Sequence, residues 1–250
     1  MKRIHTIKKK LEELKNLDKR FSIFGSGRHK YQLNKTLSEK EISQIEKENQ
    51  IVLSKEYKEI LKNLGNGGAG CGYGLERMEL KNINPPYIGT KKLLRNWKDP
   101  QKIDCDMVEL DEISGYIKLF DYGCGMEYCL IVNGAEKEDL IFFDCDGRFE
   151  KMENKSLLDI YEKWLNNSLD TLKRIQQKME KMPLQEVIDS EWEIKNFSIK
   201  EMILSIINAE PIKGSHSGND MKIHLEKEYK KWKSKKQSSS KKWWRFLKKN

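Results

Sequence analysis

The sequence lacks the features by which membrane-spanning, secreted and metal-binding proteins are usually recognised. No apolar run approaches the roughly 18 residues of a membrane span, and the Lys-rich N-terminus has no apolar signal-peptide core. The five cysteines form no Cys-x-x-Cys pair, and the four histidines are scattered along the chain. We therefore expect reduced thiols in a cytoplasmic protein that holds no metal and no cofactor.

Two short motifs resemble ligand-binding loops without the surroundings that such loops need. Gly65-x-Gly67-x-x-Gly70 matches the dinucleotide fingerprint, but that site needs a strand before the loop and a helix after it. Here the pattern predicts the reverse order, a helix and then a strand. In Asp144-Cys145-Asp146-Gly147, the next two positions carry Arg148 and Phe149, where a calcium loop needs an oxygen ligand and a glycine. We interpret both motifs as turns.

The sequence gives no local sign of catalysis. No cysteine lies in a nucleophile signature, and we predict that the protein is not an enzyme. A Cys–His pair that meets only in the folded chain stays open at this point.

Charge is distributed unevenly along the chain. The last 22 residues, 229–250, hold ten Lys or Arg and no acid, whereas residues 99–146 hold 13 acids and three lysines. Residues 1–35 are again basic, with 11 basic and three acidic side chains. Such asymmetry bears on the choice of partners and not on the fold.

Helix signals frame the chain. Apolar residues at helical spacing predict helices over 4–17 and 157–182, and a basic helix over 221–236. Ser38 with Glu41 and Ser198 with Glu201 are expected capping boxes, and Ser54 and Ser156 are expected N-caps. Gly65 is expected to end a helix in the left-handed conformation. The serines 238–240 are expected to form a flexible hinge.

Strand signals lie in the middle of the chain. We expect a strand near residues 75–80 and a β-meander over 117–120, 127–132, 140–144 and 149–152. Asn133-Gly134 and Asp146-Gly147 are the strongest turn signals between these strands.

Residues 38–169 resemble the SUKH superfamily, which includes the SMI–KNR-type proteins. The resemblance rests on ordered phrases: Tyr57-Lys58 in a helix that enters Gly65-Asn66-Gly67-Gly68, then Tyr73-Gly74-Leu75, Gly123-Cys124-Gly125, Leu130 to Asn133-Gly134, and Ser156-Leu157 with Tyr161, Trp164 and Leu165. It implies an α+β fold with a twisted, mostly antiparallel sheet packed by helices, followed here by a C-terminal helical extension. It also implies a binding role, because many bacterial members are immunity proteins that neutralise a cognate toxin, often a nuclease, by direct contact.

We accordingly divide the chain into four parts. These are a basic N-terminal helix and connection (1–35), a SUKH-like domain (36–170), a helical extension (171–236) and a flexible basic aromatic tail (237–250). The expected partner of the domain is a cognate protein toxin. The alternative is a regulatory or scaffolding protein whose tail binds nucleic acid or an anionic membrane.

Two groups of residues follow from this interpretation. An acidic surface would steer a basic toxin, since nucleases are basic in order to bind phosphates. The expected toxin contacts are Asp104, Asp106, Glu109, Asp111, Glu112 and Glu127, together with Tyr73. The expected structural positions in loops are Gly65, Asn66, Gly67, Gly68, Gly123, Gly125, Asn133 and Gly134.

Overall fold

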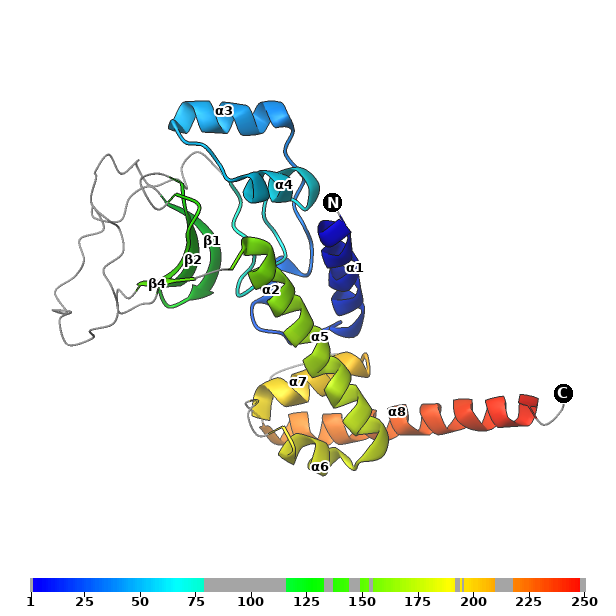
Figure 1. Cartoon of the computed structure of the whole chain (residues 1–250). Coiled ribbons are helices and arrows are strands. Elements are labelled where there is room, and N and C mark those ends of the chain that lie inside the picture. The colour runs from blue at the N-terminus through cyan, green and yellow to red at the C-terminus, as the bar shows by residue number, and fades with distance from the viewer. Residues whose placement is uncertain are drawn as a thin grey trace. The chain divides into compact units, whose positions relative to one another are not determined.

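The computed structural model of the chain forms two compact units (Figure 1). It describes residues 2–78, 116–132, 137–143, 149–152, 155–191, 194, 196–209 and 218–247. The first unit comprises Met1–Glu12 and Phe24–Asn166, and the second comprises Glu13–Ile23 and Asn167–Asn250. Residues 1–35 are thus divided between the two units.

The described part of the first unit contains five helical segments. They are the first turns of α1 (Lys2–Leu17), α2 (Ser26–His29), α3 (Glu39–Asn49), α4 (Lys55–Asn63) and the start of α5 (Leu157–Lys181). Of these, α3, α4 and α5 begin where the serine caps predict, whereas α2 lies in a segment where no helix was predicted. The Ser38–Glu41 capping box is confirmed, with each side chain bonded to the other residue's backbone N–H. Ser54 accepts from the N–H of Tyr57 at 3.2 Å, and Ser156 accepts from that of Asp159 at 3.2 Å. These bonds satisfy N–H groups that a helix leaves unpaired at its start.

Side chains join α1 to α5 within the first unit. Arg3 binds both Asp159 and Glu162, with 2.9 Å from its Nε to Glu162 Oε1. Lys10 donates to the side chain of Asn166 at 2.7 Å. The first turns of α1 are thereby fixed to the helix that follows the sheet.

The sheet is the antiparallel meander that the turn signals predict, which confirms the α+β class. Its strands are β1 (Tyr116–Gly123), β2 (Met126–Ile131), β3 (Leu140–Phe143) and β4 (Phe149–Lys151), in that spatial order. The strand expected at 75–80 is seen only as an isolated bridge from Leu75 to Phe120, and its last two residues lie outside the described part. Figure 1 shows the sheet to one side of α1 and α4.

The two faces of the sheet bury different side chains. On one face Phe120, Tyr128 and Phe142 lie opposite one another across three strands, and the ring of Phe120 also contacts Tyr161 of α5. On the other face Cys129, Ile131 and Ile141 form a buried cluster. Because each face contains an apolar cluster, polar and apolar residues do not alternate strictly along the strands.

The second unit is helical. It contains the second half of α5, α6 (Leu184–Asp189), α7 (Asn196–Ile206) and α8 (Gly218–Leu247). The predicted Ser198 cap is wrong, because α7 already begins at Asn196 and Ser198 lies in its first turn. The hinge expected at the serines 238–240 is also absent, since α8 runs through them; serine lowers helix propensity only slightly.

Buried charges join the parts of the second unit. The fully buried carboxylate of Asp18 accepts hydrogen bonds from Ser22 N and Oγ, Ile23 N and the Ser205 hydroxyl of α7, at 2.6 to 3.0 Å. The carboxylate of Glu191, 4% exposed, is paired with Arg174 and Lys178, each at 2.8 Å. These ion pairs hold the pKa of Glu191 below its usual value, the bond from Arg174 contributing most.

Candidate protein-contact surface

Residues 65–74, the glycine loop, connect α4 to the edge of the sheet. The loop pairs with itself through reciprocal Gly68–Leu75 hydrogen bonds of 2.8 Å, and Ala69 N donates to Gln32 O at 2.7 Å. It then meets β1, where Tyr73 N donates to Asp121 O at 2.7 Å and Glu76 N donates to Leu119 O at 2.8 Å. The loop is therefore an extension of the sheet beyond β1.

Two glycines of this loop allow backbone contacts that no other residue could make. Gly68 has φ 106°, and a Cβ built there would lie 2.4 Å from Gln32 O. Gly74 has φ 115°, and its Cβ would lie 2.4 Å from Gly68 O. Both the left-handed φ and the close backbone approach require glycine. Since α4 precedes the loop and an extended segment follows it, the strand–loop–helix order of a dinucleotide site is not present.

Gly65 differs from its predicted conformation. It is not among the residues with positive φ, and the C-cap of α4 is Leu64 in the right-handed region. A Cβ at Gly65 would lie 2.7 Å from Asn34 O. The glycine is thus needed for the close approach of residue 34 and not for a left-handed helix end.

The buried side chain of Asn66 stabilises the loop through hydrogen bonds to backbone. The residue is 4% exposed, and its side chain accepts from Met78 N at 2.7 Å and donates to Met78 O at 3.3 Å. Its own carbonyl accepts from the Asn34 side chain at 3.0 Å. From α5, the Tyr161 hydroxyl donates to Ala69 O at 2.6 Å. The loop is held on several sides and presents a rigid outer surface.

His29 packs beneath the loop, a role that its isolated position in the sequence did not indicate. It is 8% exposed, its Nδ1 accepts from Tyr31 N at 3.1 Å, and its ring meets Tyr31 and Trp164 edge-on. Burial lowers the pKa of His29 to about 4, against a smaller opposing effect of the Gly70 backbone. The imidazole is therefore neutral at physiological pH.

The half-buried Tyr73 is the centre of a surface patch whose exposed members are Phe24 and Arg28. Phe24, 57% exposed, lies with its ring centroid 5.3 Å from that of Tyr73, and the Arg28 guanidinium lies 5.8 Å from the Tyr73 centroid. A Cβ at Gly123 would come within 2.9 Å of the Tyr73 ring, so that ring rests on the β1–β2 turn. We call Phe24, Arg28 and Tyr73 the Tyr73 patch. Nothing in the sequence pattern predicted that residues 24 and 28 would join Tyr73.

The β1–β2 turn beneath the patch is a two-residue turn. Gly123 pairs with Met126, and the two residues between them, Cys124 and Gly125, have φ values of 51° and 73°. Positive φ at both positions matches the hairpin turns that follow the twist of a sheet. Cys124 is exposed at its tip.

The charges around the patch are largely balanced. Arg28 lies 3.8 Å from Glu76 and 3.9 Å from Asp121. Partial burial opposes ionisation of Asp121, but bonds from the Gly123 N–H and from Lys118 outweigh it and lower its pKa. Lys118 also bonds Glu127 at 2.6 Å. Glu127, an expected toxin contact, therefore has its charge offset by a neighbour on β1.

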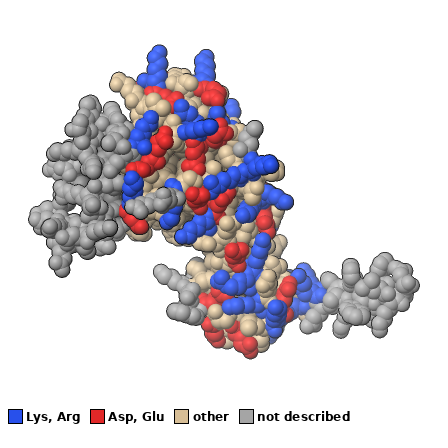
Figure 2. Space-filling view, in the orientation of Figure 1, with Lys and Arg blue, Asp and Glu red and all other residues tan. Residues whose placement is uncertain are grey.

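The other expected toxin contacts lie outside the described residues. These are Asp104, Asp106, Glu109, Asp111 and Glu112, and the expected Asn133-Gly134 turn lies there too. Over the face seen in Figure 2, acidic and basic side chains of the described part are interspersed. An acidic contact surface accordingly remains a prediction that depends on residues 99–115.

The two buried cysteines, Cys71 and Cys129, are poorly suited to nucleophilic chemistry. Burial raises the pKa of the Cys71 thiol to about 12 and raises that of Cys129 as well. In the described part of the chain, no group of three His, Cys, Asp or Glu side chains is placed to hold a metal ion.

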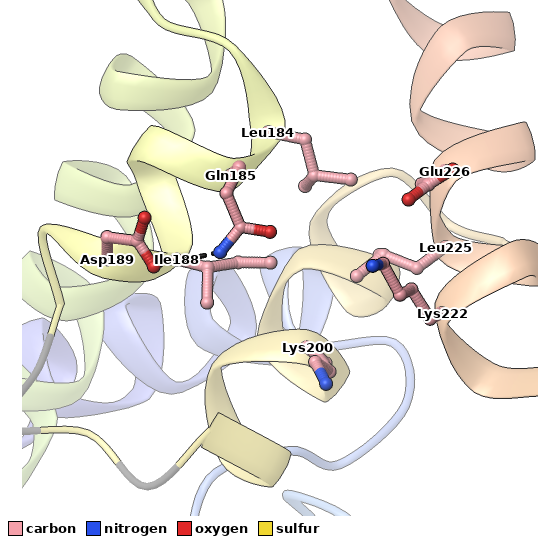
Figure 3. Close-up of a pocket in the computed structure, with 8 residues that line it drawn as sticks. All are labelled: Leu184, Gln185, Ile188, Asp189, Lys200, Lys222, Leu225 and Glu226. Carbon is pink, nitrogen blue, oxygen red and sulfur yellow. Dashed lines mark hydrogen bonds between the residues drawn. The ribbon is translucent and has the colours of Figure 1, made fainter. Parts of the chain in front are cut away.

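A small pocket lies in the second unit (Figure 3). Its volume is about 210 Å³, and α6, α7 and α8 supply its lining. Gln185 donates to Asp189 at 2.8 Å, and the lining combines apolar side chains such as Ile188 with the charged Lys200 and Lys222. Its side chains include no nucleophile beside a general base, as hydrolysis would require.

Together these features define an α+β protein in which Tyr73 of the glycine loop meets Phe24 and Arg28 from the α2 region, side chains of the kind found at protein contacts. A family model described as the SMI1 / KNR4 family (SUKH-1) matches residues 36–170, and the chain belongs to that family. The family is known for immunity-type proteins, is generally non-catalytic, and its members act on protein partners. Searches of curated proteins and of solved structures each return no match.

Proposed function

We propose that this protein is a non-catalytic immunity protein that neutralises a cognate bacterial toxin by direct contact. The observation that carries the proposal is the Tyr73 patch on the glycine loop of a SUKH domain. Tyrosine and arginine are enriched among the residues that dominate binding energy at protein interfaces. Here Tyr73 lies on a loop whose backbone is hydrogen-bonded on several sides, and Arg28 lies in helix α2, which lowers the entropy lost on binding.

The acidic segment supports the choice of a basic partner. Residues 99–146 carry a net charge of −10, from 13 acids and three lysines. Toxins that cleave nucleic acids are basic, and an acidic surface would speed their encounter with this protein. The patch would then supply short-range contacts, and Asp104, Asp106, Glu109, Asp111 and Glu112 the long-range attraction.

The test uses a toxin domain encoded beside this gene. Cells that express that domain should survive when they also express this protein, and the two should copurify. Failure of both would overturn the proposed function. A nuclease domain is expected, and loss of its activity on addition of this protein would be measured directly.

Truncations within the patch test the contact surface. We expect Phe24→Ala or Tyr73→Ala to weaken toxin affinity by about 10- to 100-fold, the range of anchor residues at interfaces. Val52→Ala is the matched control, because Val52 is also an apolar side chain of the first unit and is 56% exposed, against 57% for Phe24. Calorimetry with the toxin domain measures the three variants. Equal affinities would show that the toxin binds elsewhere on the protein.

Charge reversal tests the acidic segment separately. Changing Asp104, Asp106 and Glu109 together to Lys should slow association and reduce its salt dependence, with a smaller effect on dissociation. Stopped-flow binding at low and high salt measures this. An unchanged association rate would remove the electrostatic part of the proposal while leaving the patch in place.

A further inference from the structure

The C-terminal end of α8 combines basic and large apolar residues without any acid. The last acidic residue of the chain is Glu228. Residues 237–250, the α8 end, contain five basic residues and four large apolar ones: Lys241, Lys242, Arg245, Lys248, Lys249, Trp243, Trp244, Phe246 and Leu247. The helix continues as far as Leu247.

The preceding part of α8 is fixed to the last turn of α5. The Tyr229 hydroxyl donates to Met179 O at 2.8 Å and to Met182 O at 2.9 Å. Lys233 donates to Glu180 O at 3.2 Å, and Lys236 pairs with the Glu180 carboxylate at 3.2 Å. The Trp232 ring lies 5.9 Å from that of Tyr229. Hydroxyl and ammonium donors thus satisfy carbonyls that α5 leaves unpaired at its end.

The apolar stripe used in this contact continues into the α8 end. Leu225, Tyr229 and Trp232 follow one another at spacings of four and three residues, and Trp243 and Leu247 fall on the same side at about 100° per residue. In that register Lys241, Lys242 and Arg245 centre on the opposite side. The α8 end is therefore amphipathic by sequence, with a basic side and an aromatic side.

Where this stripe continues, α5 has already ended. Figure 1 shows α8 extending past the described residues of α5, α6 and α7 in the helical unit. From Lys236 to Leu247 the helix advances about 16 Å, at 1.5 Å per residue. The stripe that includes Tyr229, whose hydroxyl bonds to the end of α5, thus continues along a part of α8 that extends past α5.

We propose that the α8 end binds the surface of an anionic membrane and lies in the plane of its headgroups. This inference goes beyond the immunity function and does not depend on it. Tryptophan and phenylalanine favour the boundary between headgroups and acyl chains, while Lys and Arg on the other side attract anionic lipid. Among the described residues, no helix is long and apolar enough to cross the bilayer, so the contact is peripheral.

The composition favours lipid over nucleic acid. Nine of the ten basic residues after Glu228 are lysines and one is Arg245. Reading of bases relies on Arg, Asn and Gln side chains that form paired hydrogen bonds, whereas lysine acts as a point charge on either polyanion. The adjacent Phe246 and Leu247 can bury their apolar side chains in a membrane interface, whereas a nucleic-acid duplex offers no such apolar surface.

Vesicle flotation of the full-length protein tests the proposal. We expect binding to phosphatidylcholine vesicles that contain about 30% phosphatidylserine, and little binding to phosphatidylcholine alone. Binding should weaken as salt is raised from about 0.1 M to about 1 M, because the Debye length falls from about 10 Å to about 3 Å.

Three variants separate the two sides of the helix from overall charge. Trp243→Ala with Trp244→Ala keeps every charge and should weaken partition about tenfold or more. Lys241→Gln with Lys242→Gln should weaken partition by a similar factor at low salt. Lys8→Gln with Lys9→Gln removes the same charge from two exposed residues of α1 and should leave partition unchanged.

Each remaining outcome decides against the proposal. Equal partition of the Trp variant and the unchanged protein would show attraction by charge alone. Equal losses in the α1 and α8 lysine variants would show a non-specific effect of net charge. Binding to duplex DNA in fluorescence anisotropy, without binding to anionic vesicles, would assign the α8 end to nucleic acid instead. A toxin-neutralisation assay is unaffected by these outcomes and reports on the proposed function separately.

Discussion

In the first unit, neutral groups and backbone contacts hold the glycine loop, whereas in the second unit buried charges join the helices. Around the loop the buried polar side chains include Asn66 and the neutral His29, which bond to backbone groups. In the helical unit they include the carboxylates of Asp18 and Glu191, beside neutral hydroxyls such as that of Ser205. A surface that must keep one shape for a partner is thus built from contacts that salt does not screen.

The largest expected effect is a loss of stability when a close backbone contact of the glycine loop is disturbed. Gly68→Ala should destabilise the protein by at least about 3 kcal/mol, because φ is 106° and the new Cβ would lie 2.4 Å from Gln32 O. Urea unfolding of the full chain, followed by circular dichroism, measures the loss. Gly27→Ala is the control: no atom lies within 4 Å of its Cβ, and it is in helix α2. Similar stabilities of the two variants would show that the loop relaxes easily.

A smaller loss of stability is expected when a buried carboxylate of the helical unit is replaced. Asp18→Asn should cost about 2 to 3 kcal/mol, because an amide presents N–H donors to partners that are themselves donors and leaves them unsatisfied. Asp189→Asn, a change at an exposed residue of α6, is the control and should cost no more than about 0.5 kcal/mol. The same unfolding measurement applies. A negligible loss for Asp18→Asn would mean that the buried carboxylate can be replaced by any polar group.

Local signals predicted most of the fold. Serine caps and apolar spacing located α3, α4 and α5, and turn residues located the meander, because these features depend on neighbours within one or two turns. The errors at Gly65 and Ser198 arose where a tertiary contact or an earlier helix start overrode a plausible local signal. Such competition is invisible in the sequence.

The candidate surface was less predictable than the fold. Tyr73 was singled out, but its neighbours Phe24 and Arg28 lie more than 40 residues earlier in the chain and meet it only through the loop's contacts with residues 32–34. The pairing of Glu127 with Lys118 was hidden for another reason. A regular two-residue hairpin at Cys124-Gly125 would place Tyr122 opposite Glu127, but two register shifts in β1 bring Asp121 opposite Glu127 and Lys118 within reach of it.

The smallest expected effect is a pH dependence of stability that distinguishes the glycine loop from the helical unit. The pKa of His29 falls from an unfolded value of 6.5 to about 4 in the folded protein. Between these two pKa values His29 is protonated in the unfolded state and neutral in the folded state. The free energy of unfolding should therefore fall as the pH drops from above 6.5 toward 4. Between about pH 7.5 and pH 5 the loss attributable to His29 is about 2 kcal/mol.

The glycine loop and the helical unit are expected to lose stability over different pH ranges. The pKa of Glu191 is lowered, so its contribution is complete above its unfolded value of 4.5 and is lost only at lower pH. Urea unfolding from about pH 7.5 to pH 5 thus reports on His29 while the Glu191 ion pairs stay intact. His29→Gln removes the titrating group and should flatten the dependence in this window, whatever its absolute stability. A variant that loses stability with the same slope as the unchanged protein would show that the loop does not depend on a neutral histidine, and the contrast between the units would then rest on Asn66 and the glycines alone.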